Sequence, residues 1–168
     1  VIRIGMVLLP DAAVVWAPVV GIVAVVNVLY GALCAASQTD LKYIVAYSSV
    51  SHMGIVLLGA ATMTASGWNG AVYQMFAHGI MTGLLFALVG MVYDRAHTRD
   101  IGELSGLAHR MPFITVMMMI AGLASLGLPA LAGFVSEVTV FLGTFEKHEA
   151  LTIVGVIGIA FAAGYILW

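Results

Sequence analysis

Apolar residues along this chain form long continuous runs that are separated by short polar connections. A membrane-spanning helix needs about 20 apolar residues, with about 17–25 as the usual range. The runs are too long for strands and do not alternate with period two, and only helices or closed barrels satisfy every backbone group in lipid. The pattern predicts an all-α membrane protein with five transmembrane helices, at residues 13–37, 41–63, 68–93, 112–145 and 150–168.

The fourth run is interrupted at residues 128–133, which include Pro129, and it carries Glu137 just beyond the interruption. An ionised side chain in the membrane costs about 2.5–3.5 kcal/mol on insertion scales and is therefore usually functional. Ion paths in membrane proteins are often built beside broken helices. We predict that this helix is broken near Pro129 and that Glu137 serves a proton path. The alternative is that Glu137 only pairs with a lysine from another segment.

The two ends of the sequence do not match complete spans. Residues 1–9 are apolar but too short to cross a membrane, and Pro10 closes them, while the last run still continues at Trp168. We expect residues 1–12 to be the end of a preceding transmembrane helix and its loop. Residues 13–168 are then a five-helix domain within a longer polypeptide, truncated at both ends.

Composition and charge exclude several classes of protein. The chain is 62% hydrophobic and 8% charged, whereas a soluble domain has about 25% charged residues. Six Lys and Arg residues provide no basic patch for nucleic acid. The single cysteine, Cys34, fits no metal-binding spacing. We expect an integral membrane protein that is surrounded by the lipid bilayer and has no nucleic-acid partner.

The polar connections alternate between two sides of the membrane. One side holds residues 38–40 and 94–111, with most of the basic side chains near them: Lys42, Arg95, Arg99 and Arg110. The positive-inside rule places that side in the cytoplasm or its equivalent. The mixed charges of residues 93–100 suggest that this loop contacts a neighbouring subunit or an adjacent loop, although an ordinary solvated loop has the same composition.

Three more ionisable residues lie within the predicted spans. His52 and His78 are at similar depths on consecutive helices, and histidine exchanges protons near neutral pH at little cost. Lys42 is one turn into its helix, where it either joins a proton path or extends to the interface or to Asp40. Each histidine alone has a structural alternative, a hydrogen bond to a neighbouring carbonyl or hydroxyl. A metal or haem role for them has no third ligand or sequence signature to support it.

Several motifs together resemble the antiporter-like membrane subunits of respiratory complex I (NADH:quinone oxidoreductase), including the subunit M group, which is chain 4 or the D subunit in cyanobacteria and chloroplasts. The resemblance covers nearly the whole chain. It rests on residues 38–42 (QTDLK), 46–54 (AYSSVSHMG), 74–79 (QMFAHG), 93–99 (YDRAHTR), 124–129 (ASLGLP) and 133–137 (GFVSE).

The resemblance implies that the five helices form one inverted repeat of the antiporter-like fold, the second of two. It assigns proton-path roles to Lys42, His52, His78 and Glu137, with Glu137 as the last carrier. The chain departs from the family pattern at two positions: Tyr43 stands where arginine is common, and Ala130 stands where glycine often follows the proline.

The implied function is proton translocation that is driven by electron transfer in other subunits. The resemblance places NAD, FMN, iron–sulfur clusters and quinone in those partner subunits, and no cofactor in this chain. The resemblance implies a bacterial plasma membrane, a thylakoid membrane or an organelle inner membrane, with other membrane subunits of complex I as neighbours. The alternatives are the D subunit of a multisubunit sodium/proton antiporter, a membrane-bound hydrogenase subunit, or a purely structural membrane anchor.

Overall fold

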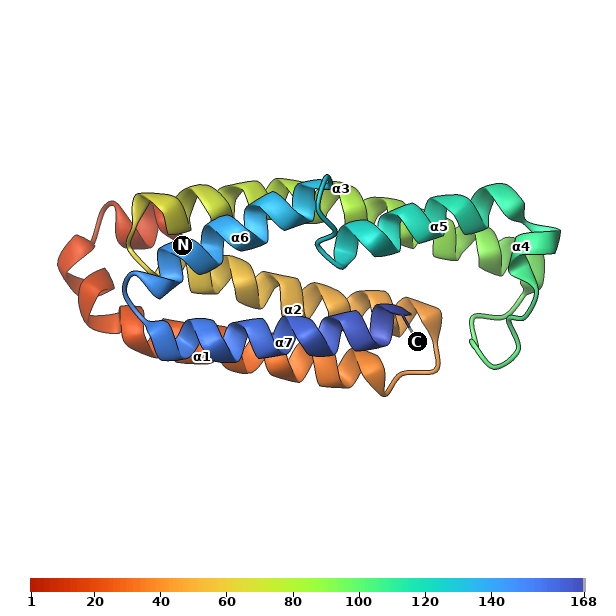
Figure 1. The fold of residues 1–168 in the computed structure, drawn as a ribbon, viewed down its shortest axis with the longest axis horizontal. Helices are drawn as coiled ribbons and strands as arrows, with labels where there is room; N and C mark the ends of the chain where they lie inside the picture. The colour runs from red at the N-terminus through yellow and green to blue at the C-terminus, as the bar shows by residue number, and fades with distance from the viewer. Residues whose placement is uncertain (168) are drawn as a thin grey trace.

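A computed structural model describes residues 1–167 as an elongated bundle of helices (Figure 1). Apart from one antiparallel bridge between Asp40 and Asp100, all regular structure in this range is helical. Trp168, where the last predicted helix continues, lies outside the described residues. The elements are η1 (Ile2–Met6), α1 (Pro10–Ala36), α2 (Leu41–Ala61), α3 (Ala65–Ala96), α4 (Leu107–Arg110), α5 (Pro112–Ser125), α6 (Ala132–Phe145) and α7 (Glu149–Leu167).

Local sequence signals explain where most of these helices begin. Pro10 and Pro112 occupy the first turns of α1 and α5, where a missing backbone N–H costs nothing. The Asp40 carboxylate accepts a hydrogen bond of 2.8 Å from the Lys42 backbone N–H and caps α2. The Thr64 hydroxyl caps α3 in the same way, at 3.1 Å from the Gly67 nitrogen.

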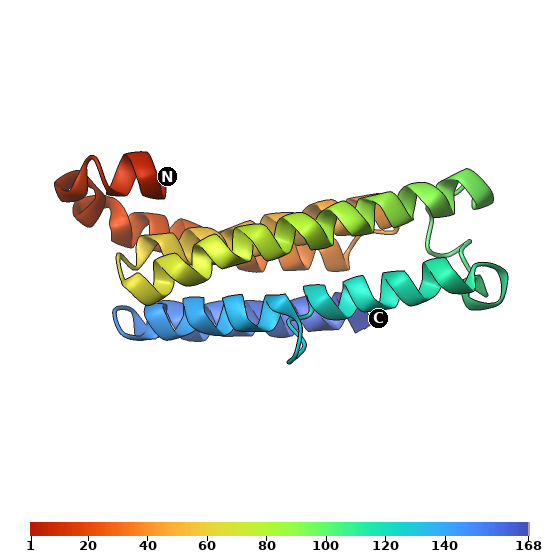
Figure 2. The ribbon, with the colours of Figure 1, turned by 90° about the horizontal axis from the view of Figure 1, so that it is seen from above.

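Helices α1, α2, α3 and α7 are each long and apolar enough to cross a membrane. Helices α5 and α6 are shorter, at 14 residues each, and they lie end to end along α3 (Figures 1 and 2). The chain between them leaves the helical path with positive φ at Gly127 (+70°) and Ala130 (+82°). The predicted interruption is therefore confirmed, and it begins at Leu126, slightly earlier than the sequence indicated.

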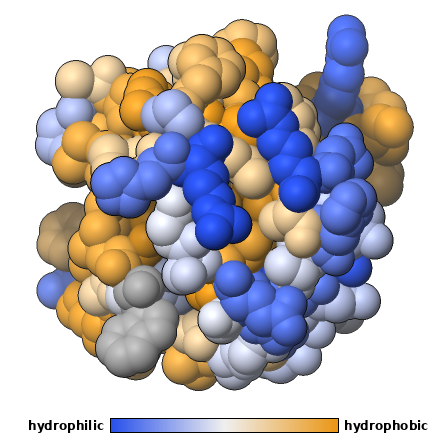
Figure 3. All heavy atoms as spheres, turned by 90° about the vertical axis from the view of Figure 1, so that its right-hand side faces the viewer, coloured by the Kyte–Doolittle hydropathy of each residue, from blue (hydrophilic) through white to orange (hydrophobic). Residues whose placement is uncertain are grey.

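The polar connections gather at the two ends of the bundle. The α1–α2 connection meets the loop after α3, where the Leu41 backbone N–H donates to the Arg99 carbonyl at 3.0 Å. The Arg99 side chain is 3.3 Å from the Asp40 carboxylate and stacks on the Tyr93 ring at 5.2 Å. The charged loop thus contacts an adjacent loop, one of the two predicted contacts. Figure 3 shows hydrophilic side chains gathered at this end.

At the other end, glycines let helix backbones approach closely. A Cβ atom built on Gly70 of α3 would lie 2.7 Å from the backbone nitrogen of Val140 in α6. One built on Gly59 of α2 would lie 2.8 Å from the carbonyl oxygen of Gly67. Close approach of this kind is how membrane helices gain packing energy where lipid provides no hydrophobic drive. We call this region, formed by α2, α3 and α6 around Val140, the tight end.

Candidate functional site

Polar side chains are buried together where α2, α3, α5 and α6 meet beside the helix break. His52, His78 and Glu137 are 3%, 9% and 6% exposed. The structure thus brings three of the four sequence-predicted site residues into one cluster. The predicted similar depth of the two histidines is confirmed, because their ring centroids are 5.3 Å apart.

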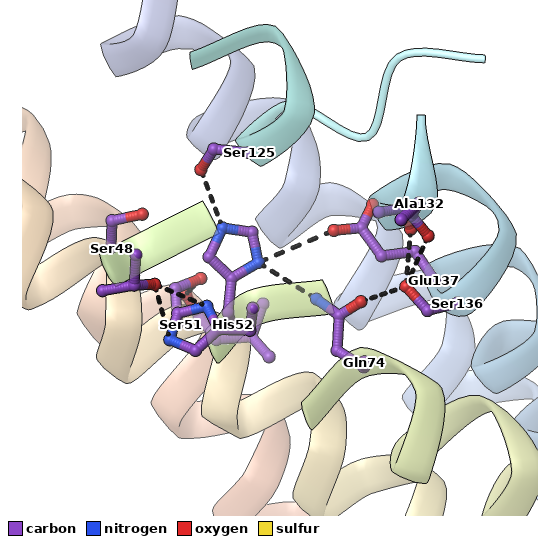
Figure 4. Close-up of polar contacts among 12 residues, drawn as sticks. Ser48, Ser51, His52, Gln74, Ser125, Ala132, Ser136 and Glu137 are labelled. Carbon is purple, nitrogen blue, oxygen red and sulfur yellow. Dashed lines mark hydrogen bonds and ion pairs between the residues drawn. The ribbon is translucent and has the colours of Figure 1, made fainter. Parts of the chain in front are cut away.

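His52 is at the centre of the cluster and contacts three other helices (Figure 4). Its Nε2 atom is 3.0 Å from the hydroxyl of Ser125, the last residue of α5. Its Nδ1 atom is 3.6 Å from the Glu137 carboxylate of α6 and 3.4 Å from the amide nitrogen of Gln74 on α3. Both ring nitrogens therefore have polar partners, and one of those partners is an ionisable carboxyl group.

His78 extends the cluster along α3. Its ring nitrogens are 3.1 and 3.2 Å from the hydroxyl of Thr82, one turn away. A small cavity of about 30 Å³ lies beside the two histidines. A cavity of this size is large enough for a water molecule, and His52, Gln74 and His78 are polar residues of its lining. The cavity is lined by His52, Gln74, Ala77, His78, Met81, Ala124, Ala132 and Gly133.

The broken helix positions Glu137 against His52. Glu137 lies in the second turn of α6, and its carboxylate packs directly on Gly127 of the break. A Cβ atom at position 127 would overlap this carboxylate, and the positive φ of Gly127 also favours glycine there. Gly133 lets the first turn of α6 approach the Ala124 carbonyl in the same way.

Lys42 is not part of this cluster. It is exposed in the first turn of α2, and within residues 1–167 its side chain makes no ion pair. The nearby Asp40 carboxylate instead caps the α2 backbone and pairs with Arg99. The structure therefore separates Lys42 from the two histidines and Glu137.

Four further polar residues of the site were not singled out from the sequence. Gln74, Ser125 and Ser136 contact the cluster directly, and the Tyr165 hydroxyl of α7 donates to Ser48 at 2.9 Å. Gln74 precedes His78 by four residues and so shares its helix face, which is a signal that the sequence did contain. The roles of Ser125 and Ser136 depend on how the broken helix packs, and no local pattern indicates it.

The arrangement suits proton transfer. The His52 ring lies 3.6 Å from the Glu137 carboxylate and 5.3 Å, between ring centroids, from the His78 ring. Hydroxyls and an amide provide the other polar contacts of the two imidazoles. Among the described residues, the structure contains no cluster of three or more His, Cys, Asp or Glu side chains that is suited to holding a metal ion.

Comparison with known proteins agrees with this geometry. Residues 1–162 match the family described as "NADH:quinone oxidoreductase/Mrp antiporter, TM". The NAD(P)H-quinone oxidoreductase chain 4 1 of Synechococcus elongatus is 49% identical over 142 residues, which are 84% of this chain and 27% of that protein. The chain therefore spans less than a third of the length of that relative.

Two solved structures share the fold. A chain of respiratory complex I from Thermus thermophilus with bound NADH superposes with a TM-score of 0.96 at 34% identity, over 99% of this chain and 36% of that one. A chain of the Mrp complex from Dietzia sp. DQ12-45-1b superposes with a TM-score of 0.89 at 26% identity, over 94% and 30% of the two chains. This chain therefore belongs to the NADH:quinone oxidoreductase/Mrp antiporter transmembrane family.

Proposed function

We propose that this chain is part of a proton-translocating membrane subunit of a quinone oxidoreductase. The observation that carries the proposal is the buried contact between His52 and Glu137 beside a broken membrane helix. The 49% identity to an oxidoreductase chain 4 supports the same conclusion. The NAD, FMN, iron–sulfur and quinone chemistry belongs, in this proposal, to partner subunits, and the chain's neighbours are other membrane subunits and lipid.

We further propose that α5 and α6 together form one crossing, so that the chain crosses the membrane five times. Two helices of 14 residues rise about 21 Å each at 1.5 Å per residue. Neither spans a hydrocarbon core of about 30 Å alone. Their end-to-end placement supports a single broken span (Figure 2). The break then lies at membrane depth, where its free backbone groups need partners other than lipid.

In the proposed mechanism, protons pass between His78, His52 and Glu137, and Glu137 releases them toward the side of the turn that joins α2 and α3. Moving one proton against the membrane potential costs about 2.3 kcal/mol per 100 mV. The energy comes from electron transfer in the partner subunits, through changes in charge or conformation. Lys42 keeps its proposed place in the path, at the opposite, basic end of the bundle.

The alternative function is that of a subunit in a multisubunit sodium/proton antiporter. Such subunits share this fold, but the comparisons support this alternative less. The Mrp chain is 26% identical to this chain, against 49% for the oxidoreductase chain. We therefore place the chain with the redox-driven enzymes. In this reading, proton transport by the assembled complex stops when electron transfer is inhibited, whereas an antiporter would exchange protons for sodium without a redox substrate.

Replacement of Glu137 by glutamine tests the proposal. The variant keeps the size and hydrogen bonding of the side chain but cannot carry a proton. We expect the assembled complex to retain its fold and to lose most proton transport per electron, measured in inverted membrane vesicles with a pH-sensitive dye. Glu146→Gln, at the exposed end of the same helix, is the matched control. Normal transport in Glu137→Gln would overturn the proposal.

A further inference from the structure

Gln74 lies beside the contact between His52 and Glu137, the two ionisable partners of the site. It is 2% exposed, and the two ends of its amide reach different helices. The amide nitrogen is 3.4 Å from His52 Nδ1 on α2. The amide oxygen accepts a hydrogen bond from the Ser136 hydroxyl on α6, next to Glu137. Figure 4 shows this amide beside the contact between His52 and Glu137.

In this orientation the amide determines which nitrogen of His52 carries the proton. An amide nitrogen only donates hydrogen bonds. The facing Nδ1 atom must therefore accept, and a neutral His52 carries its proton on Nε2. That proton is donated to the Ser125 hydroxyl at 3.0 Å. Gln74 thus selects one tautomer of the neutral ring.

The opposite orientation of the amide also has a hydrogen-bond partner at each end. A half turn directs the amide oxygen at Nδ1, which must then carry a proton, and the amide nitrogen donates to Ser136. The Ser136 hydroxyl can accept this bond, because its own proton then reaches the carbonyl of Gly133 at 2.8 Å or of Ala132 at 3.1 Å. Two discrete arrangements are therefore available in the same packed site, without a buried unsatisfied group.

We propose that Gln74 is a two-position positioning residue, whose amide turns when His52 Nδ1 gains or loses a proton and so controls transfer between His52 and Glu137. The inference rests on the proposed role of His52 and Glu137 in proton transfer. With its nitrogen toward His52, the amide competes with Glu137 for Nδ1. With its oxygen toward His52, it accepts a hydrogen bond from the Nδ1–H group and stabilises the charged ring.

The transfer step is a proton exchange without redox chemistry. The O–H bond of a protonated Glu137 breaks and an N–H bond forms at His52 Nδ1, which converts a neutral pair into a carboxylate and an imidazolium. Without a turn, an N–H group of the Gln74 amide would face the new N–H group of His52. The turn brings the amide oxygen to this place, where it accepts a hydrogen bond from Nδ1–H. The reverse transfer restores the first orientation.

Three variants in the full-length, assembled complex test this role. Gln74→Met keeps the length of the side chain and removes both hydrogen-bonding ends. Ser136→Ala removes the hydroxyl that anchors the far end of the amide and leaves the amide itself in place. Gln38→Met is the control, because Gln38 lies in the α1–α2 connection and its amide bonds only the Cys34 carbonyl within the described residues.

The first measurement is the tautomer of neutral His52, read from the ring ¹⁵N resonances of histidine-labelled complex and assigned by difference against a His52→Asn variant. We expect wild type and Gln38→Met to show Nδ1 unprotonated. Gln74→Met should show a mixture of both tautomers, and Ser136→Ala a smaller shift in that direction. An unchanged single tautomer in Gln74→Met and Ser136→Ala would overturn the inference.

The second measurement is proton transport per electron. We expect Gln74→Met to slow transport roughly tenfold. This is the change in rate that follows when the transition state of the transfer step loses the free energy of about one hydrogen bond. If Gln74→Met prevents assembly, the His52 tautomer and the proton transport of Ser136→Ala test the inference instead. Normal transport in Glu137→Gln would contradict the proposed function itself. Loss of transport in Glu137→Gln, with wild-type transport and tautomer in Gln74→Met, would contradict only the role of Gln74.

Discussion

The two ends of the bundle pack differently on either side of the site. At the tight end, glycines bring the backbones of α2, α3 and α6 into direct contact around the fully buried Val140. At the opposite end, α5 leaves a groove of about 260 Å³ beside α2 and α7. This groove, which we call the open end, reaches Ser48, Ser125 and Tyr165.

This difference shows how the site is connected to the two sides of the bundle. The groove of the open end reaches the hydroxyl group of Ser125, which contacts His52 at 3.0 Å. Toward the other side, a proton that leaves Glu137 meets tightly packed backbone.

The largest effect is expected when a methyl group is inserted at the tight end. In Gly70→Ala the new Cβ would lie 2.7 Å from the Val140 backbone nitrogen, which cannot move aside as a side chain can. Overpacking of a core costs about 1–3 kcal/mol and sometimes more, so we expect strongly reduced assembly, measured as the amount and thermal stability of the purified complex.

Gly79→Ala is the matched control on the same helix. Apart from its chain neighbours and the nearby backbone of α3 itself, no described atom lies within 4 Å of a Cβ at Gly79. Alanine favours a helix over glycine by about 0.5–1 kcal/mol. The comparison between the two ends would be contradicted if Gly70→Ala and Gly79→Ala gave complexes of equal stability.

The next largest effect is expected at the break itself. Gly127→Ala places a methyl group against the Glu137 carboxylate and a side chain at a φ of +70°. The left-handed conformation costs about 1–2 kcal/mol for an L-residue, and displacement of Glu137 should reduce proton transport beyond this loss of stability. We expect a moderate fall in thermal stability together with low transport per electron. Stable assembly with normal transport would show that Gly127 does not position Glu137.

A smaller effect is expected at the open end. Tyr165→Phe removes the hydrogen bond of 2.9 Å to Ser48 without changing the shape of the ring. One hydrogen bond contributes about 0.5–1.5 kcal/mol, so thermal unfolding should shift slightly. The effect should be clearly smaller than that of Gly70→Ala. An equal or larger loss would mean that the open end, not the tight end, holds the bundle together.

The smallest effect, and one of opposite sign, is expected from Ala130→Gly. Ala130 has a φ of +82°, the conformation that glycine adopts without strain. Relief of this strain is partly offset by the greater freedom of glycine in the unfolded chain. We therefore expect the free energy of unfolding to increase by about 0.5 kcal/mol, measured by thermal unfolding. A loss of stability would show that the alanine methyl group makes a favourable contact in the assembled protein.

The sequence predicted the parts of this structure that depend on composition and local pattern. The long apolar runs, the break before Glu137 and the shared depth of His52 and His78 all follow from helix length and from Pro129. Family resemblance also indicated that Ala130 replaces a common glycine, and the structure supplies the reason, a positive φ at this position.

Contacts between helices could not be predicted in this way. The direction of the Gln74 amide depends on Ser136, which is 62 positions further along the chain. The contact between His52 and Ser125 spans 73 positions. The difference between the tight and open ends also depends on which glycines face a neighbouring helix: Gly70 and Gly79 have the same chemistry, but Gly70 meets α6 and Gly79 meets no described atom.

The central claim is that Glu137 exchanges a proton with His52, and infrared difference spectroscopy of the assembled complex tests it most directly. The carbonyl stretch of a protonated carboxyl group is identified as Glu137 by its absence in Glu137→Gln. We predict that this band changes when substrate starts turnover, and that His52→Asn abolishes the change while Glu146→Gln leaves it intact. A Glu137 band that stays constant while the complex transports protons would contradict the account.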